Sequence, residues 1–167
     1  ENTLLDASIG LFQSDSDCAQ IVLMYAQSDE EYMKNRYGDM DKVELHQGGA
    51  TRQESAGIGL RSVNQPFVMI HDAARPFVTR EQIDLLKEAL ETEDACLLMV
   101  PSVDTVKIVD NGYVKKTPLR KNVYNAQTPQ CFRTELIRSC YELSLAQGRQ
   151  ATDDAQLVEW YTNVPIK

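Results

Sequence analysis

The chain has 167 residues, 43% of them hydrophobic, which fits one globular domain of ordinary composition. Its formal net charge of −8 argues against non-specific binding to nucleic acid or to an anionic membrane, since both depend on clustered positive charge. No apolar stretch reaches the roughly 18 residues that span a bilayer, and the first residues lack the basic and apolar regions of a signal peptide. We therefore expect a soluble, cytoplasmic protein.

Short apolar runs alternate with helical patterns from the start of the chain. Residues 4–12 carry apolar side chains spaced for one helical face, and residues 21–25, IVLMY, form an unbroken apolar run of strand length. An S-x-x-E capping box at Ser28 predicts a helix toward Tyr37, and a short strand is predicted at 43–45. Runs that are apolar on both faces are typical of buried parallel strands.

The same alternation continues to residue 100. Capping boxes at Thr51 and Thr79 each predict the start of a helix, because Glu or Gln follows three residues later. Residues 67–70, FVMI, and residues 95–100 are predicted strands. Strands and helices in this order predict an α/β fold with a doubly wound, mostly parallel sheet.

The pattern changes at residues 103–124. Apolar residues flank Asn111-Gly112, and Asn-Gly is the strongest short hairpin signal, so this segment is predicted to be an antiparallel arm. An arm with one apolar side commonly buries it against another subunit, which predicts a homodimer. The arm also concentrates basic charge on an acidic chain, at Lys107, Lys115, Lys116, Arg120 and Lys121.

Two helices are predicted after the arm. Residues 132–145 have an amphipathic pattern that ends at Gly148, and residues 153–161 form a last helix for which Thr152 is the expected N-cap.

Ligands of open α/β sheets bind beyond the carboxyl ends of the strands, so the loops after strands are the places to look. The first such loop is GGATRQES, residues 48–55. Its glycine pair lets a ligand approach the backbone, and the helix that follows favours an anion or a polar base edge at its N-terminus. A glycine pair before a helix is more often just a tight turn, so this pattern alone is weak evidence.

The second loop is HDAARPFVT, where Asp72 ends a buried strand. One carboxylate there could hold Mg²⁺, with water and phosphate oxygens as the other ligands, and Arg75 could pair with phosphate bidentately. The same residues equally allow a structural arrangement, in which Asp72 accepts N–H bonds in a turn and Arg75 is its salt-bridge partner. His71 has no spaced partner and is expected to be packed or hydrogen-bonded.

The third candidate loop is NAQTPQCF, residues 125–132, together with ATDDAQLVE, residues 151–159. Both are rich in side chains that can hydrogen-bond phosphate or hydroxyl groups. Helix caps and proline turns explain each of these residues separately, although a helix N-terminus after Thr152 could still offer N–H groups to a phosphate.

In this order, GGATRQES, HDAARPFVT, VDTVK, NAQTPQCF and ATDDAQLVE resemble the 2-C-methyl-D-erythritol 4-phosphate cytidylyltransferases of non-mevalonate isoprenoid biosynthesis. The resemblance implies a Rossmann-like nucleotidyltransferase sheet and CMP transfer from CTP to the alcohol phosphate. The products would be 4-diphosphocytidyl-2-C-methyl-D-erythritol and pyrophosphate. It also implies Mg²⁺, a homodimer with embracing arms, and a bacterial cytosol or a plastid as the compartment.

Two other interpretations stay open. Ribitol-5-phosphate cytidylyltransferases resemble the chain through HDA-RP and QTPQ, although AARP, the run Thr105-Val106-Lys107 and TDDA favour the methylerythritol enzymes. A non-catalytic nucleotide-binding remnant is the alternative from another class of protein.

The resemblance also implies roles for matching positions. The nucleotide-binding positions are Gly49, Ser55, Asp72 and Ala73. The substrate-binding positions are Arg75, Thr105, Arg120, Thr128 and Thr152. Asp72 would hold Mg²⁺ and Arg120 would position the attacking phosphate, so these two are the expected catalytic residues. Thr105 and Arg120 lie on the arm, from which the family reaches the neighbouring subunit's substrate.

The chain departs from the family pattern in three respects. Ala50 replaces an Asp of many members, and TPLR at residues 117–120 replaces T-x-D/S-R. The family's first strand with its glycine-rich, Arg- and Lys-bearing loop has no counterpart before Glu1, and its C-terminal strand and helix have none after Lys167. We therefore expect a longer protein, and predict that these 167 residues alone neither fold stably nor turn over CTP, because neighbours of a missing central strand expose unpaired edges.

Overall fold

The computed structural model describes residues 2–167. Its helices and strands, in chain order, are α1 (Leu4–Gln13), β1 (Ile21–Tyr25), η1 (Gln27–Asp29), α2 (Glu30–Tyr37), β2 (Val43–Gln47), α3 (Arg52–Ser62), β3 (Phe67–Ile70), α4 (Arg80–Leu90), β4 (Ala95–Pro101), β5 (Ile108–Asp110), β6 (Tyr113–Lys116), η2 (Arg120–Asn122), β7 (Tyr124–Arg133), α5 (Thr134–Gln147) and α6 (Asp154–Tyr161).

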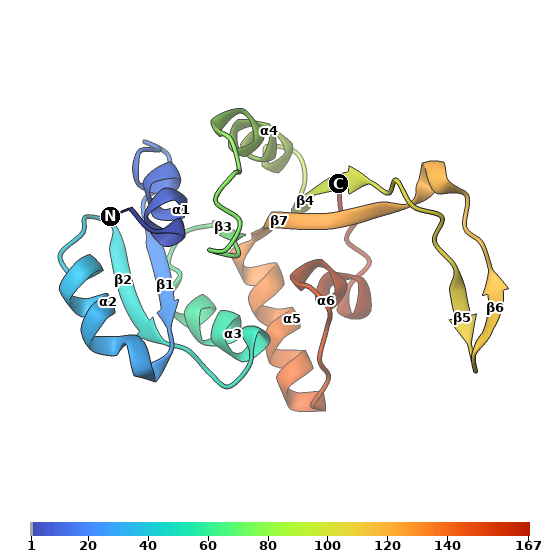
Figure 1. The fold of residues 1–167 in the computed structure, drawn as a ribbon. Coiled ribbons are helices and arrows are strands. Elements are labelled where there is room, and N and C mark those ends of the chain that lie inside the picture. The colour runs from blue at the N-terminus through green and yellow to red at the C-terminus, as the bar shows by residue number, and fades with distance from the viewer. Residues whose placement is uncertain (1) are drawn as a thin grey trace.

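The body of the molecule is built on two sheets (Figure 1). Strands β1 and β2 pair in parallel, as predicted, with Leu23 beside Leu45. The other sheet has the order β3-β7-β4, and β7 runs antiparallel to both neighbours. Strands β3 and β4 are therefore parallel to each other, and the α/β prediction is confirmed with an antiparallel strand between them.

Helices cover both faces of the β3-β7-β4 sheet, because successive side chains of a strand point to opposite faces. Cys131 of β7 packs with Leu86 and Leu90 of α4 on one face. Its neighbour Phe132 packs with Ile137 of α5 on the other face. This arrangement, with α4 above and α5 below β7 in Figure 1, is the doubly wound layering that the sequence predicts.

The prediction that residues 125–132 form a loop is wrong, because they lie within β7. Gln130 is buried at 1% exposure between β3 and β4, and its side-chain amide is satisfied by Asp153 and by the backbone N–H of Ala155. A polar residue paired inside the core looks like a loop residue in the sequence, which explains the error.

Helix starts agree with the sequence only in part. Thr79 forms a complete capping box with Gln82. The Thr51 hydroxyl accepts from the Glu54 N–H, but the Glu54 carboxylate turns to the Ala50 N–H instead. The prediction that Thr152 caps the last helix is wrong, because Asp153 is the N-cap of α6 and its carboxylate accepts from the Gln156 N–H.

The helix predicted from the box at Ser28 also begins elsewhere. Residues 27–29 form η1, and α2 begins at Glu30 without a side-chain cap. The Ser28 hydroxyl donates to the side chain of Asp29 rather than capping the helix. Gly148, by contrast, ends α5 in the left-handed conformation, as the sequence predicts.

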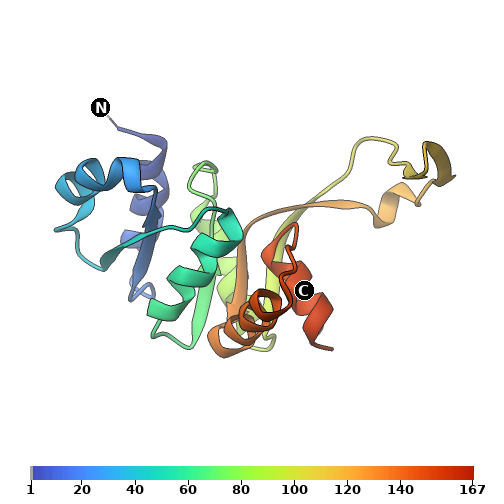
Figure 2. The same ribbon diagram turned by 90° about the horizontal axis from the view of Figure 1, so that it is seen from below.

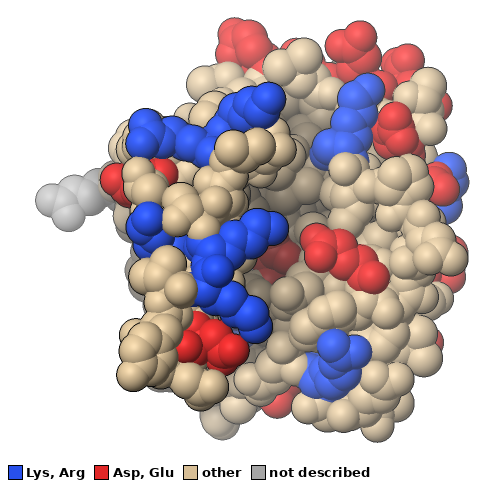
Figure 3. Space-filling model, turned by 90° about the vertical axis from the view of Figure 1, so that its right-hand side faces the viewer, with Lys and Arg blue, Asp and Glu red and all other residues tan. Residues whose placement is uncertain are grey.

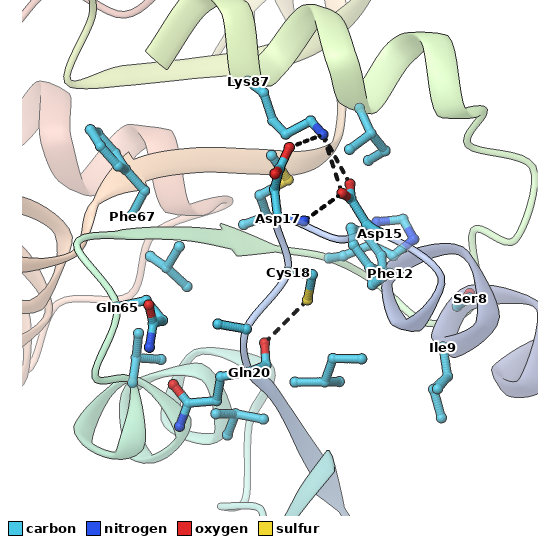
Figure 4. A pocket seen from close by; sticks show the side chains of 18 of the residues that line it. Ser8, Ile9, Phe12, Asp15, Asp17, Cys18, Gln20, Gln65, Phe67 and Lys87 are labelled. Carbon is cyan, nitrogen blue, oxygen red and sulfur yellow. Dashed lines mark hydrogen bonds and ion pairs between the residues drawn. The ribbon is translucent and has the colours of Figure 1, made fainter. Parts of the chain in front are cut away.

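A cavity of about 520 Å³ separates the two sheets. Among the described residues β1 pairs only with β2 and β3 only with β7, so the facing edges of β1 and β3 are unpaired. Ile21 and Leu23 of β1, Phe67 and Met69 of β3, and parts of α1 and α4 line the cavity. Figure 4 shows this space and, at its rim, Lys87 beside Asp15 and Asp17.

Strands β5 and β6 form the predicted hairpin, turning at Asn111 and Gly112 with φ values of 50° and 81°. The hairpin stretches away from the body in two perpendicular views (Figures 1 and 2). Its apolar side chains are exposed, including Val109, Tyr113 and Val114. In the described part of the chain, no helix is both long and apolar enough for a membrane span.

Candidate active site

The first candidate loop is shaped by close contacts that only glycine permits. A Cβ on Gly48 would lie 2.7 Å from the Ser55 Oγ, and one on Gly49 would lie 2.6 Å from the Glu54 Cβ. The Gly49 N–H donates to the Ser55 Oγ at 3.1 Å, and the Ser55 hydroxyl donates to the Thr51 carbonyl at 2.9 Å. The loop is therefore a tight turn whose hydroxyl and glycines already fit together before any ligand binds.

Asp72 follows β3 and is partly exposed, with its carboxylate facing two arginines. Its Oδ1 accepts from the Arg52 Nε at 2.9 Å, and its Oδ2 lies 3.5 Å from the Arg75 Nε. The Arg75 N–H donates to the Asp72 carbonyl at 2.9 Å, which closes the turn. The structural arrangement that the sequence left open, an Asp72–Arg75 ion pair in a turn, is thus present.

A short hydrogen-bond chain holds this turn against β7. The Thr128 Oγ accepts from the Asp72 N–H at 3.1 Å and lies 3.0 Å from the His71 Nδ1, while the His71 Nε2 lies 3.2 Å from the Arg75 carbonyl. Burial lowers the pKa of His71 below its ordinary value. In the neutral ring, Nε2–H then donates to Arg75 and Nδ1 accepts from the Thr128 hydroxyl. The expectation that His71 is hydrogen-bonded is confirmed.

Arg52 is the residue of this region to which the sequence analysis gave no role. Its terminal nitrogens Nη1 and Nη2 reach the two carboxylate oxygens of Asp154 at 3.3 and 2.8 Å, and its Nε reaches Asp72. Asp154 is fully buried and also accepts from the Tyr141 hydroxyl. Burial alone would lower the pKa of Arg52, but the carboxylates of Asp154 and Asp72 outweigh it and raise that pKa above its ordinary value. The signal in the sequence was an Arg inside GGATRQES and a second Asp in TDDA.

The start of α6 is fixed by neighbours from α3 and β7. The Ala151 N–H donates to the Gln53 Oε1 at 2.8 Å, and Gln130 holds Asp153 from the other side. Both the N–H and the hydroxyl of Thr152 donate to the Gln156 Oε1. A second cavity of about 180 Å³ lies here, between the N-termini of α3 and α6, lined by Thr51, Arg52, Gln53, Tyr141, Gln150, Ala151, Thr152 and Asp153.

These contacts bring together most of the predicted site residues on the body. Arg52 joins the glycine loop to Asp72 and to the start of α6, and Thr128 joins Asp72 to β7. Ala73 follows Asp72 directly, and its carbonyl accepts from the Ser8 hydroxyl at 3.0 Å.

Thr105 and Arg120 lie apart from this group, on the arm. The Arg120 Nη2 donates to the Thr105 Oγ at 3.1 Å, which joins the two legs of the arm. Among the described residues, no hydrogen bond or ion pair links either of them to Asp72. Figure 3 looks at the molecule from the arm side and shows Lys and Arg side chains gathered along one side of a hollow.

Among the described residues, no three or more His, Cys, Asp or Glu side chains lie together in a group that could hold a metal ion. Asp72 would have to act as a single protein ligand. That fits Mg²⁺, which commonly takes one or two carboxylates and completes its shell with water and phosphate oxygens. The Oδ2 of Asp72 lies 3.5 Å from the Arg75 Nε and is the less tightly paired of its two carboxylate oxygens, since Oδ1 accepts from Arg52 at 2.9 Å.

Comparison with known proteins gives one consistent result. The family model described as 2-C-methyl-D-erythritol 4-phosphate cytidylyltransferase matches residues 1–165. The enzyme of that name from Shouchella clausii is 38% identical over 160 residues, covering 93% of this chain and 70% of its own.

Solved structures agree. The structure of 4-diphosphocytidyl-2C-methyl-D-erythritol synthase from Anaerococcus prevotii has a TM-score of 0.93 and 32% identity, covering 99% of this chain and 75% of its own. The structure of 2-C-methyl-D-erythritol 4-phosphate cytidylyltransferase from Francisella tularensis has a TM-score of 0.84 and 28% identity. It covers 99% of this chain and 77% of its own. The similarity therefore extends over nearly all of this chain and confirms the Rossmann-like nucleotidyltransferase fold.

Proposed function

Because the chain belongs to the 2-C-methyl-D-erythritol 4-phosphate cytidylyltransferase family, we propose that it transfers CMP from CTP to 2-C-methyl-D-erythritol 4-phosphate. The products are 4-diphosphocytidyl-2-C-methyl-D-erythritol, which is an intermediate of isoprenoid biosynthesis, and pyrophosphate, which is the group that leaves CTP. The observation that carries the proposal is the ion-pair group at one end of the sheets, where Arg52 joins the glycine loop and α6 to Asp72.

The nucleotide would bind over the glycine loop and the turn after β3. Gly49 and Ser55 contact the cytidine in this proposal, and Ala73 lines the nucleotide. Position 49 requires glycine, because a Cβ there would lie 2.6 Å from the Glu54 Cβ and would displace the loop. The Ser55 hydroxyl donates a hydrogen bond to the Thr51 carbonyl, so it would meet the base as a hydrogen-bond acceptor.

Asp72 would hold Mg²⁺ beside the CTP phosphates, and Arg75 would bind a phosphate. Mg²⁺ bound there supplies positive charge that neutralises the phosphates during the displacement. Arg75 is suited to a phosphate because its guanidinium is exposed and presents a planar fork of donors. Its present partners are the carboxylate of Asp72, in the same turn, and the side chain of Gln127, on the neighbouring strand β7.

The nucleophile needs no general base in this mechanism. The phosphate of the substrate is already ionised at neutral pH, so catalysis consists of alignment and of neutralising charge at the α-phosphate. The neutral His71, whose two ring nitrogens are both engaged, is consistent with this requirement. Thr128 and Thr152 would help to hold the alcohol phosphate from β7 and from the start of α6.

The protein would act as a homodimer whose arms cross to the neighbouring subunit. The support is the hairpin itself, which stretches away from the body and exposes Val109, Tyr113 and Val114, an apolar surface that a second subunit could cover. Thr105 and Arg120 would then meet the partner's substrate, with Arg120 positioning the attacking phosphate. The compartment we propose is the bacterial cytosol, because similar enzymes such as that of Shouchella clausii come from bacteria.

A direct assay tests the function and separates it from its closest alternative. The protein, expressed from its whole reading frame and purified, is incubated with CTP and Mg²⁺ and with each alcohol phosphate in turn, and CDP-alcohol and pyrophosphate are measured. We expect product with 2-C-methyl-D-erythritol 4-phosphate and little with ribitol 5-phosphate. A preference for ribitol 5-phosphate would reassign the substrate. CTP binding without turnover of either substrate would favour the non-catalytic remnant.

A further inference from the structure

Arg52 contacts a buried carboxylate and an exposed one with different edges of the same guanidinium. The Nη1 and Nη2 edge takes both oxygens of Asp154 at 3.3 and 2.8 Å, and the Nε takes the Oδ1 of Asp72 at 2.9 Å. The guanidinium is planar and its donors are fixed relative to one another. Fixing one edge therefore fixes the direction in which the other edge points.

The anchored edge is the buried one. Asp154 has no exposed surface and lies at the first position of α6, where a helix N-terminus stabilises negative charge. It also accepts from Tyr141, which is 7% exposed. Asp154 is therefore held on several sides, and it holds Arg52 in turn. The Arg52 side chain itself is 44% exposed.

We propose that Arg52 is a positioning residue that orients the Asp72 carboxylate for a divalent cation. By holding Oδ1 at 2.9 Å, it prevents rotation of the carboxylate and leaves Oδ2, which lies 3.5 Å from the Arg75 Nε, as the oxygen that would meet the cation. This inference rests on the proposed function, because it assigns to Asp72 the metal that accompanies CTP. It adds Arg52, with Asp154 behind it, to the residues that govern the metal.

The geometry distinguishes this role from simple packing. Arg52 is the first residue of α3, and the hydroxyl of the N-cap Thr51, not the Arg52 side chain, caps this helix. A lysine at this position would keep one positive charge, but it has no second edge with which to hold Asp154 and Asp72 together. Arg52→Lys is therefore the informative change.

The experiment measures cation binding directly rather than turnover. Mn²⁺ replaces Mg²⁺ as the probe, its binding in the presence of CTP is followed by electron paramagnetic resonance, and CTP binding without metal is measured by calorimetry in EDTA. We expect Arg52→Lys to weaken Mn²⁺ binding by about 10- to 100-fold, the usual cost of changing a residue that orients a metal ligand. Metal-free CTP affinity should change less than about twofold. Arg61→Lys, an exposed change on the same helix, is the matched control and should change neither quantity.

The outcomes separate a positioning role of Arg52 from a structural one. If Arg52→Lys weakens metal-free CTP binding as much as Mn²⁺ binding, it has merely displaced the glycine loop, and the positioning role is overturned. Unchanged Mn²⁺ binding overturns it as well. If the wild-type protein shows no CTP-dependent Mn²⁺ site, the proposed function fails first, which separates the two failures.

A second variant protects the test against misfolding. Asp154→Asn keeps the shape of the anchor but removes its charge, so Arg52 is held less firmly. We expect it to weaken Mn²⁺ binding in the same direction with the circular dichroism spectrum unchanged. If Arg52→Lys does not fold and Asp154→Asn binds Mn²⁺ like the wild type, the inference is wrong.

Discussion

At the scale of single residues, several contacts hold Asp72, the carboxylate that we propose as the metal ligand. Asp72 is held at its N–H by Thr128, at its carbonyl by the turn to Arg75, and at Oδ1 by Arg52. A residue held at its backbone N–H, at its carbonyl and at one carboxylate oxygen loses little freedom when it binds a ligand, which lowers the entropic cost of binding.

Asp72→Asn tests this role. We expect turnover to fall by orders of magnitude while the melting temperature changes little, because Asn keeps the shape and the hydrogen-bonding oxygen but loses the charge that anchors the cation. The measurement is turnover over a range of Mg²⁺ concentrations, with Asp39→Asn, an exposed change on the far loop before β2, as the control. Turnover that is unchanged at saturating Mg²⁺ would remove Asp72 from the site.

At the scale of elements, ion pairs fix α4 to the segment between α1 and β1. Asp15 is 7% exposed, and its Oδ2 lies 2.5 Å from the Arg80 Nη1 and 3.1 Å from the Lys87 Nζ. Burial alone would raise the pKa of Asp15, but the Asp17 N–H and Lys87 outweigh it, and the pKa lies below its ordinary value. Because these groups stand at the rim of the cavity between the sheets, they hold its two sides together (Figure 4).

The lowered pKa sets the pH dependence of stability. A carboxyl group whose pKa is lower in the folded state contributes stability above its unfolded pKa, near 3.8 for Asp15, and loses that contribution as the pH falls through the folded value. We expect Asp15→Asn to lower the free energy of unfolding at pH 7 by about 1–3 kcal/mol. The wild type and the variant should converge as the pH falls below the unfolded pKa.

Urea unfolding at a series of pH values provides the measurement. Asp17→Asn is the matched control, because Asp17 shares Lys87 with Asp15 but its side chain is 69% exposed. An exposed pair of this kind contributes about 0–1 kcal/mol, so the control should stay close to the wild type. Equal effects of the two variants would contradict the importance that we assign to the buried pair.

At the scale of the whole molecule, the homodimer that we propose would share each active site between two subunits, because its arms would cross to the neighbouring body. We expect Arg120→Ala to abolish turnover, because the attacking phosphate loses its positioning charge. Mixed dimers of Arg120→Ala and Asp72→Asn subunits should regain activity in the site that combines a wild-type arm with a wild-type body. Turnover of mixed and unmixed preparations is compared at equal protein concentration, and the absence of rescue would contradict action in trans.

The cavity between the sheets leaves the facing edges of β1 and β3 unpaired among the described residues. An unpaired edge presents N–H and C=O groups that can pair with another strand.

Local signals in the sequence predicted most elements of the body, because strands and helices here have clear apolar runs and caps. Residues 21–25 and 67–70 became β1 and β3, and the Asn111-Gly112 turn became the β5–β6 hairpin. The sequence failed at β7, since Gln130 is polar but buried, and at the start of α6, since Asp153 and Thr152 are both good caps. Such choices depend on partners distant in sequence.

The sequence by itself therefore determined the α/β class, the arm and the order of motifs that places the chain in its family. Only the tertiary structure decided that Arg52 connects Asp72 to Asp154, residues that are 82 positions apart (154 − 72 = 82). It also decided that the edges of β1 and β3 face each other across a cavity. The physical reason is that propensity, caps and periodicity act over a few residues, whereas ion pairs and strand pairing join groups that meet only when the chain is folded.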